Sequence, residues 1–209
     1  MAIDWTLYLV TDPHLAGGRD NVVGIVKEAI RGGVTVVQLR DKEASDEQIE
    51  STARELLAVL GDIPLFINDR VEVAAKLGCH LHIGQDDMAF RVARDKLGDD
   101  QLIGLSVGSQ EELEAIADDA RPDVIGIGPV HSTATKKDAP AGMGPDAAKA
   151  LAHAARQRGI ASVAIGGIKT HNAHELAGDD FSGICVVSAI MAAQDPAAAA
   201  AQLKEAFRG

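Results

Sequence analysis

Apolar residues occur along the chain in short β-branched runs that alternate with longer amphipathic or Ala-rich runs. A short apolar run bounded by turn residues is typical of a buried strand, and a longer run with a period of 3.6 residues predicts a helix. The short runs predict strands over 6–11, 34–39, 64–68, 80–83, 102–106, 123–127, 161–165 and 183–187. The longer runs predict helices near 20–31, 45–60, 70–77, 88–97, 109–119, 145–158, 170–178 and 196–208.

Polar residues and glycines mark the ends of several predicted helices. Ser45 lies three residues before Gln48, and Ser109 lies three residues before Glu112, which is the spacing of an N-terminal capping box. Asp195 is a capping residue placed just before a proline, which suits the first helical turn. Glycines stand where helices are expected to stop, at Gly32, Gly33, Gly61, Gly78, Gly98 and Gly159.

Alternation of strands and helices over the whole chain predicts a parallel sheet with right-handed crossovers. Strands that are each followed by a helix, eight times in 209 residues, fit a single (β/α)8 TIM barrel, and we expect one catalytic domain over 1–209. The alternative is an open doubly wound sheet. That fold would carry its phosphate loop after the first strand, where residues 11–18 lack the G-x-G-x-x-G pattern.

Composition narrows the class of protein. Aromatic residues are only 3% of the chain, so the core must consist of Val, Ile, Leu and Ala. A net charge of -11 makes the chain a poor general binder of nucleic acid. Cys79 and Cys185 are too few for a disulfide framework. With neither a signal peptide nor an apolar stretch long enough to span a bilayer, we expect a cytoplasmic protein that does not bind membranes.

Chemically capable residues follow the ends of the first predicted strands, where TIM barrels carry their active sites. Arg40 and Lys42 follow the second strand and bring two positive charges suited to phosphate, unless they belong to a solvated loop. Asp69 and Asp87 follow the third and fourth strands. They could share one Mg²⁺, or each could cap the next helix. His80 and His82 lie on one face of the fourth strand, where a packed or hydrogen-bonded pair is favoured over a zinc site.

Later strand ends carry features of phosphate binding. Ser106 follows the fifth strand without a His-Asp pattern that would make it a nucleophile. Residues 126–138 form a long loop rich in hydroxyl groups and lysine, which is typical either of a binding loop or of a solvated connection. Gly166-Gly167 and Val187-Ser188 follow the last two strands, at the position of the usual barrel phosphate site.

Seven segments, taken in order, resemble the signatures of the thiamine phosphate synthase family: QLRDK, INDR, HIGQDD, GLS, GPVHSTATK, AIGGI and VVSAI. The resemblance extends from about Leu7 to about Pro196, and the joint order and spacing of the segments are specific. It implies a (β/α)8 barrel that uses Mg²⁺. It also implies a reaction that joins 4-amino-2-methyl-5-hydroxymethylpyrimidine diphosphate to 4-methyl-5-(2-phosphooxyethyl)thiazole, releasing thiamine phosphate and pyrophosphate.

The resemblance also implies roles for single residues. Asp69 and Asp87 would hold Mg²⁺, and Arg40, Lys42 and Lys136 would stabilise the leaving diphosphate as catalytic residues. The residues implied to contact substrate are Gln38, Leu39, Arg40, Asp41, Lys42, Asn68, Ser106, Thr133, Ala134, Thr135, Lys136, Gly167, Val187 and Ser188. Within this list, Thr133, Thr135, Gly167, Val187 and Ser188 would hold the thiazole phosphate.

Three departures from the family pattern affect the expected fit of the substrates. Gly78-Cys79-His80 stands where the family has an Ala-Asp-Gly-like turn, and His131-Ser132 stands where the family has Phe-Pro. A longer turn over 178–182 replaces a Gly-Ala-Asp turn. None of these changes removes an implied ligand.

Other functions remain open from the residues alone. A thiazole tautomerase is a similar barrel, in which His131 could transfer the proton. A non-catalytic phosphate sensor would keep Gly166, Gly167 and Ser188 without the metal pair. A sugar-phosphate epimerase would need an acid/base pair or a metal centre at opposing strand ends, and no convincing pair is found. Small-molecule partners are expected in each case, and a homo-oligomer is left open.

Overall fold

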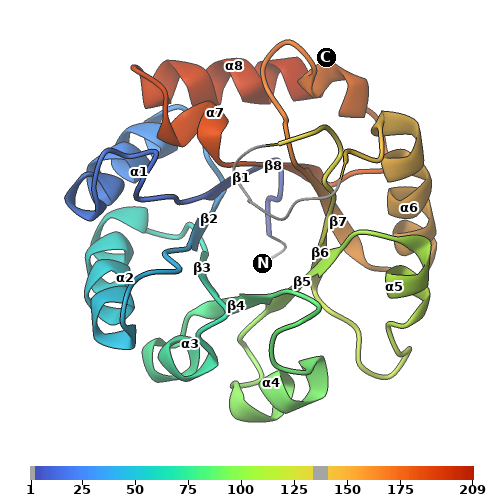
Figure 1. The fold of residues 1–209 in the computed structure, drawn as a ribbon, viewed down its shortest axis with the longest axis horizontal. Coiled ribbons are helices and arrows are strands. Elements are labelled where there is room, and N and C mark those ends of the chain that lie inside the picture. The colour runs from blue at the N-terminus through green and yellow to red at the C-terminus, as the bar shows by residue number, and fades with distance from the viewer. Residues whose placement is uncertain (1–2, 134–140) are drawn as a thin grey trace.

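The computed structural model describes residues 3–133 and 141–209. In these residues, eight parallel strands form a closed barrel in sequence order, with β8 paired to β1 (Figure 1). The strands are β1 (Leu7–Val10), β2 (Val36–Leu39), β3 (Leu65–Asn68), β4 (His80–Ile83), β5 (Ile103–Val107), β6 (Val124–Ile127), β7 (Ala161–Ile165) and β8 (Gly183–Val186). The predicted single (β/α)8 TIM barrel is confirmed, and the open sheet is excluded.

Helices surround the strands as an outer ring (Figure 1). They are η1 (Arg19–Asn21), α1 (Val22–Arg31), α2 (Asp46–Leu60), α3 (Val71–Leu77), α4 (Phe90–Lys96), α5 (Gln110–Glu114), α6 (Pro145–Gln157), η2 (Ala173–Leu176), α7 (Ser188–Met191) and α8 (Pro196–Arg208). The structure described here contains no helix long and apolar enough to cross a membrane.

The predicted helix caps are present. The Ser45 hydroxyl accepts from the Gln48 N–H at 3.3 Å, and the Gln48 side chain accepts from the Ser45 N–H at 2.9 Å, which completes a capping box. The Ser109 hydroxyl accepts from the Glu112 N–H and caps α5, but the Glu112 side chain accepts from the Gly108 N–H, so the predicted box is not completed there; Asp195 caps α8 by accepting from the Ala198 N–H. Gly32, Gly61 and Gly78 are the C-terminal caps of α1, α2 and α3.

Two predicted helices are shorter than the sequence pattern indicates. The helix expected over 109–119 ends at Glu114, because the Arg158 guanidinium takes the carbonyl oxygens of Leu113 and Ile116. The helix expected over 170–178 is reduced to the 3-10 turn η2, because the Asn172 side chain bonds to the turn that precedes it. Arg158 thus satisfies carbonyl groups at the end of α5, and Asn172 satisfies backbone groups of the turn before η2.

Hydrophobic side chains form two layers, one between the strands and the helices and one inside the barrel. Inside the barrel, the Tyr8 and Phe66 rings lie 5.6 Å apart, and Trp5 packs 5.9 Å from Phe66. Trp5 belongs to the segment that precedes β1, which lies inside the ring of strands in the view of Figure 1. Because this segment precedes β1, the aromatic side chains fill the amino end of the barrel and leave its polar residues at the carboxyl end.

Candidate functional site

The carboxyl ends of all eight parallel strands lie at one end of the barrel, and the predicted site residues follow these strand ends. The first polar side chain beyond the aromatic layer is Gln38, which is 4% exposed and donates to the Tyr8 hydroxyl at 3.1 Å. Its carboxamide therefore marks the border between the apolar interior of the barrel and its polar end.

Arg40 is held through its backbone. Its N–H donates to the Thr11 hydroxyl at 2.9 Å, and that hydroxyl donates to the Arg40 carbonyl at 3.1 Å. Among the described residues, no hydrogen bond or ion pair engages the Arg40 guanidinium. The loops after β1 and β2 thus fix the position of Arg40 and leave its charged group available.

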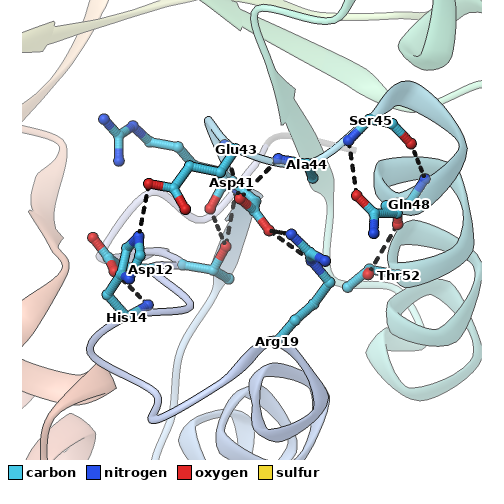
Figure 2. A network of polar contacts seen from close by, with 11 residues as sticks. Asp12, His14, Arg19, Asp41, Glu43, Ala44, Ser45, Gln48 and Thr52 are labelled. Atoms are coloured by element: carbon cyan, nitrogen blue, oxygen red, sulfur yellow. Dashed lines mark hydrogen bonds and ion pairs between the residues drawn. The ribbon is translucent and has the colours of Figure 1, made fainter.

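Asp41 is part of a network that joins the loops after β1 and β2 (Figure 2). Arg19 contacts Asp41 Oδ2 at 2.7 Å through two guanidinium nitrogens. The N–H groups of Glu43 and Ala44 donate to Asp41 Oδ1, each at 3.1 Å. The Asp41 side chain is only 7% exposed, and both of its oxygens accept hydrogen bonds that hold the loop carrying Arg40 and Lys42.

Leu39 also contributes little side-chain surface to a ligand. It is 2% exposed and belongs to the hydrophobic layer between the strands and the helices. Only its backbone is placed to meet a substrate at this strand end. The predicted contacts of Leu39 and Asp41 with substrate remain predictions.

Replacing Asp41 with Ala should lower the free energy of unfolding by about 2 kcal/mol, because three hydrogen bonds to one largely buried carboxylate are lost. Urea unfolding measures this change. Asp119→Ala is the matched control: it breaks an Asp–Arg pair whose carboxylate is 74% exposed, and it should leave the urea midpoint unchanged. Equal destabilisation by the two substitutions would mean that the Asp41 network does not hold the loop.

Asp69 and Asp87 come together at the ends of β3 and β4. Burial raises the pKa of Asp69 from 3.8 to about 6, with the hydrogen bond to Asp87 and its charge adding to the effect and Lys42 opposing it. Burial opposes the shift at Asp87, but its hydrogen bonds to Asp69 and to the Gly84 N–H prevail and lower its pKa. Without a cation, Asp69 therefore holds a proton up to about pH 6 while Asp87 is ionised, so the pair carries less negative charge below that pH.

The helix-capping interpretation of these two residues is wrong. No side chain caps α3, whose N-cap residue is Arg70, or α4, whose N-cap residue is Ala89. Asp69 instead occupies a left-handed conformation with φ 61°, a strained geometry that turns the chain at the end of β3. Asp87 Oδ2 accepts from the Gly84 N–H at 2.6 Å, within its own loop.

The acidic pair fits a hard divalent cation. The described residues contain no group of three metal-binding His, Cys, Asp or Glu side chains, so the protein offers two carboxylates and not a closed cage. Mg²⁺ commonly binds through one or two carboxylates and completes its coordination with water and substrate phosphates. Lys42 Nζ lies 3.7 Å from Asp69 Oδ2, so a cationic side chain faces the same position.

Sequence reasoning did not assign His82 to the site. The imidazole Nε2 lies 3.1 Å from Ser106 Oγ, and burial lowers the pKa of His82 to about 4, so the ring is neutral at physiological pH. His82 pairs in register with Gly104, where an added Cβ would lie 2.4 Å from His82 Nδ1. The sequence signal was a glycine on the strand beside an inward-facing histidine.

The loops after β6 and β7 pack closely against each other. The Val130 N–H donates to the Ile165 carbonyl at 2.9 Å, and the His131 N–H donates to the Gly166 carbonyl at 3.0 Å. An added Cβ would lie 2.6 Å from Pro129 Cα at Gly166, and 2.7 Å from His131 Cβ at Gly167. This close approach, together with positive φ angles, explains the double glycine.

The loops after β7 and β8 are joined by a contact that sequence analysis missed. Lys169 Nζ donates to Ser188 Oγ at 2.8 Å. Gly167, Val187 and Ser188 lie on these two loops, where the phosphate site was predicted. A lysine two residues after the double glycine was the signal available in the sequence.

The long loop after β6 is described in part. Ala134, Thr135 and Lys136 lie outside the described residues, and Thr133 is the last residue before that gap. His131 Nε2 lies 3.8 Å from Glu175 Oε2 on η2, and its side chain is 24% exposed. Cys79 and Cys185 are both buried and unpaired.

Comparison with known proteins agrees with this arrangement. Residues 7–190 match the profile of a family described as thiamine monophosphate synthase. The thiamine-phosphate synthase of Azorhizobium caulinodans is 45% identical over 96% of this chain and 94% of its own length. The solved thiamine phosphate pyrophosphorylase from Pyrococcus furiosus has a TM-score of 0.80 and 31% identity, covering 98% of this chain and 96% of its own.

Higher identity is found with part of a longer protein. The thiamine biosynthesis multifunctional protein ThiED of Corynebacterium efficiens is 52% identical over 98% of this chain, but this chain spans only 29% of that protein. A 3-hexulose-6-phosphate synthase, with a TM-score of 0.68 and 16% identity, shares the barrel fold alone. The family match and the full-length relatives establish that the chain belongs to the thiamine monophosphate synthase family.

Proposed function

We propose that this chain by itself joins the pyrimidine diphosphate to the thiazole phosphate, releasing thiamine phosphate and pyrophosphate. The observation that carries the proposal is the acidic pair Asp69–Asp87 beside Lys42, with the Asp69 pKa raised to about 6. Two carboxylates that lie together next to a lysine suit a substrate that brings both a divalent cation and a diphosphate.

Asp69 and Asp87 would hold Mg²⁺ as its two protein ligands. When bound, the ion would neutralise negative charge on the diphosphate as it leaves. The Asn68 side chain hydrogen-bonds to Asp69 and opposes protonation of that carboxyl, so it favours the ionised form that a metal needs. The neighbouring side chains of Asn68 and Lys42 thus both favour the ionised form of Asp69 that binds a cation.

Arg40 and Lys42 would stabilise the leaving diphosphate. The bond that breaks joins the pyrimidine methylene carbon to a diphosphate oxygen, and its electron pair leaves with that oxygen. Positive side chains aimed at the oxygen therefore lower the barrier most at the moment of bond breaking. Lys136 is proposed for the same task and lies outside the described residues.

His82 and Ser106 would position the pyrimidine without attacking it. Among the described residues, His82 Nδ1 has no hydrogen-bond partner, so no third group orients the imidazole as the base of a nucleophilic serine. Because its pKa is lowered to about 4, His82 adds no positive charge beside the cation that forms on the pyrimidine methylene. The thiazole nitrogen then donates its electron pair to that carbon, which requires only correct placement.

The loops after β7 and β8 would bind the phosphate of the thiazole. Gly166 and Gly167 bring backbone close to the loop after β6, and Ser188 supplies a hydroxyl. The proposed contacts from Thr133, Thr135 and Val187 complete this side of the site. The diphosphate of one substrate and the phosphate of the other would thereby be bound at different strand ends, with the reacting atoms between them.

We also propose that residues 1–209 act as one catalytic domain in the cytoplasm, on small-molecule substrates. The net charge of -11 supports the proposal that nucleic acid is not among its partners. The two unpaired cysteines are consistent with a reducing compartment.

Mixing the purified chain with both substrates and Mg²⁺ should release pyrophosphate and form thiamine phosphate in equal amounts, measured by chromatography. Addition of EDTA should stop turnover, and excess Mg²⁺ should restore it. Formation of product from the isolated chain would show that it needs no attached domain. A folded chain that yields no product from authentic substrates would overturn the proposal.

A further inference from the structure

Lys169 lies at the strand ends that would receive the thiazole phosphate, and neither the family motifs nor the mechanism above uses it. Its ammonium donates to Ser188 Oγ at 2.8 Å and so connects the loop after β7 with the loop after β8. The side chain is half-buried. Among the described residues, none of the ion pairs involves Lys169, so its charge is not neutralised by a neighbouring carboxylate.

The backbone of Lys169 is fixed by Asn172, which is 8% exposed. The Lys169 N–H donates to Asn172 Oδ1 at 2.7 Å, and Asn172 Nδ2 donates to the Gly167 carbonyl at 3.1 Å. One buried carboxamide thus ties the lysine to the double-glycine turn. The ammonium is therefore presented from a turn that is held before any ligand arrives, which lowers the entropy lost on binding.

Because Lys169 donates the hydrogen bond to Ser188, the Ser188 hydroxyl can itself donate to a ligand. A lysine ammonium has three donors and no acceptor, so Ser188 Oγ must accept from Lys169. The hydroxyl proton of Ser188 is then free to be donated elsewhere. An anion beside this pair would receive one hydrogen bond from the serine and a charge-assisted one from the ammonium.

We propose that Lys169 is a phosphate-binding residue that sets specificity for the phosphorylated form of the thiazole substrate. The inference rests on the proposed function and adds a cation to the phosphate site that the glycines and Ser188 supply. Lys169 binds the phosphate by its charge and orients the Ser188 hydroxyl toward it. A thiazole that carries an alcohol in place of the phosphate gains little from this residue.

Calorimetric titration of the chain with thiazole phosphate, thiazole alcohol and inorganic phosphate tests the inference without turnover. Lys169→Met should weaken thiazole phosphate binding by about 10- to 100-fold, the usual effect of a lost hydrogen bond to a charged group. Binding of the alcohol should change by less than about 2-fold, since uncharged contacts are kept. Lys169→Arg should retain most of the phosphate affinity because it keeps the charge.

Lys27→Met is the matched control, because Lys27 is an exposed lysine on α1. It removes the same charge from the chain and should leave all three affinities unchanged. Raising the salt concentration should weaken phosphate binding by the wild type more than by Lys169→Met. Steady-state kinetics should show the loss in the KM for the thiazole phosphate, with the KM for the pyrimidine diphosphate unchanged.

The outcomes separate this inference from the proposed function. Unchanged thiazole phosphate affinity in Lys169→Met, with coupling intact in the wild type, would overturn the role of Lys169 alone. Equal weakening of the phosphate and the alcohol would also overturn it, because Lys169 would then only join the two loops. A wild type that binds thiazole phosphate through Lys169 but makes no product would keep the phosphate site and overturn the coupling function.

Discussion

Asp69→Asn should reduce coupling by about 10³-fold, because loss of one of two carboxylate ligands removes several kcal/mol of electrostatic stabilisation. The amide fills the same space but carries no charge for a cation. Pyrophosphate release measured over a range of Mg²⁺ concentrations checks this, and higher Mg²⁺ should restore part of the rate. Asp87→Asn should show the same dependence on Mg²⁺, since Asp87 is hydrogen-bonded to Asp69 and is proposed to bind the same ion.

Asp69→Asn should also make the metal-free protein more stable above pH 6. The folded-state pKa of Asp69 is about 6 against 3.8 for an ordinary Asp. Between these values the folded protein holds a proton that the unfolded chain has released, so stability falls as the pH rises through this window. An Asn cannot ionise and avoids this cost, which we expect to be on the order of 1 kcal/mol at pH 8.

Urea unfolding in EDTA, at pH 8 and at pH 4, measures this gain. The variant should exceed the wild type at pH 8 and match it more closely at pH 4, where Asp69 is protonated in the folded state. Asp119→Asn, an exposed carboxylate in an ion pair, is the control and should gain nothing at either pH. Wild-type turnover by Asp69→Asn would show that this pair does not bind the metal, and lower stability of the variant at pH 8 would refute the raised pKa of Asp69.

Arg40→Gln should lower kcat/KM for the pyrimidine diphosphate by about 10²- to 10³-fold, the effect of removing one group that stabilises charge in the transition state. The fold should be unaffected, since the contacts of Arg40 with Thr11 are made by its backbone. Arg40→Lys should recover part of the rate, because it keeps the charge but loses the planar fork. Steady-state kinetics with each substrate varied in turn measures these effects.

Arg54→Gln is the control for Arg40→Gln, because Arg54 lies on α2 with its side chain 60% exposed and paired to Glu50. It should leave both kcat and KM unchanged. A loss in Arg40→Gln that appears only in the KM for the thiazole phosphate would assign Arg40 to the other substrate. Equal losses in both variants would indicate a general effect of charge and not a contact with the diphosphate.

The barrel was predictable because its strands are short apolar runs and its helices carry local signals. Ser45, Ser109 and Asp195 cap helices at the predicted positions, and each uses atoms within three residues of itself. The two shortened helices came from side-chain contacts that the apolar pattern does not show: Asn172 bonds to the turn before η2, and a distant residue contacts the end of α5. Arg158 ends α5 from 42 residues away in the chain, and no local pattern around residue 116 indicates it.

The candidate site was predictable where residues follow strand ends, because parallel strands bring these positions to one end of the barrel. Asp69 and Asp87 illustrate the limit. Their spacing allowed either a metal site or two helix caps, and only the structure excludes the caps. His82 and Lys169 were missed, because each contacts a residue at another strand end. His82 contacts Ser106, and Lys169 contacts Ser188.

By itself, the sequence determined the strand–helix order, the capped helix starts, and the motifs that assign the chain to its family. These properties depend on residues close together in the chain, or on motif order, and both are readable without coordinates. Tertiary structure alone decided that Asp41 is engaged by Arg19, that Asp69 is hydrogen-bonded to Asp87 with a raised pKa, and that Lys169 meets Ser188. Burial, pKa and hydrogen-bond direction depend on which distant groups meet, and that is settled only when the barrel closes.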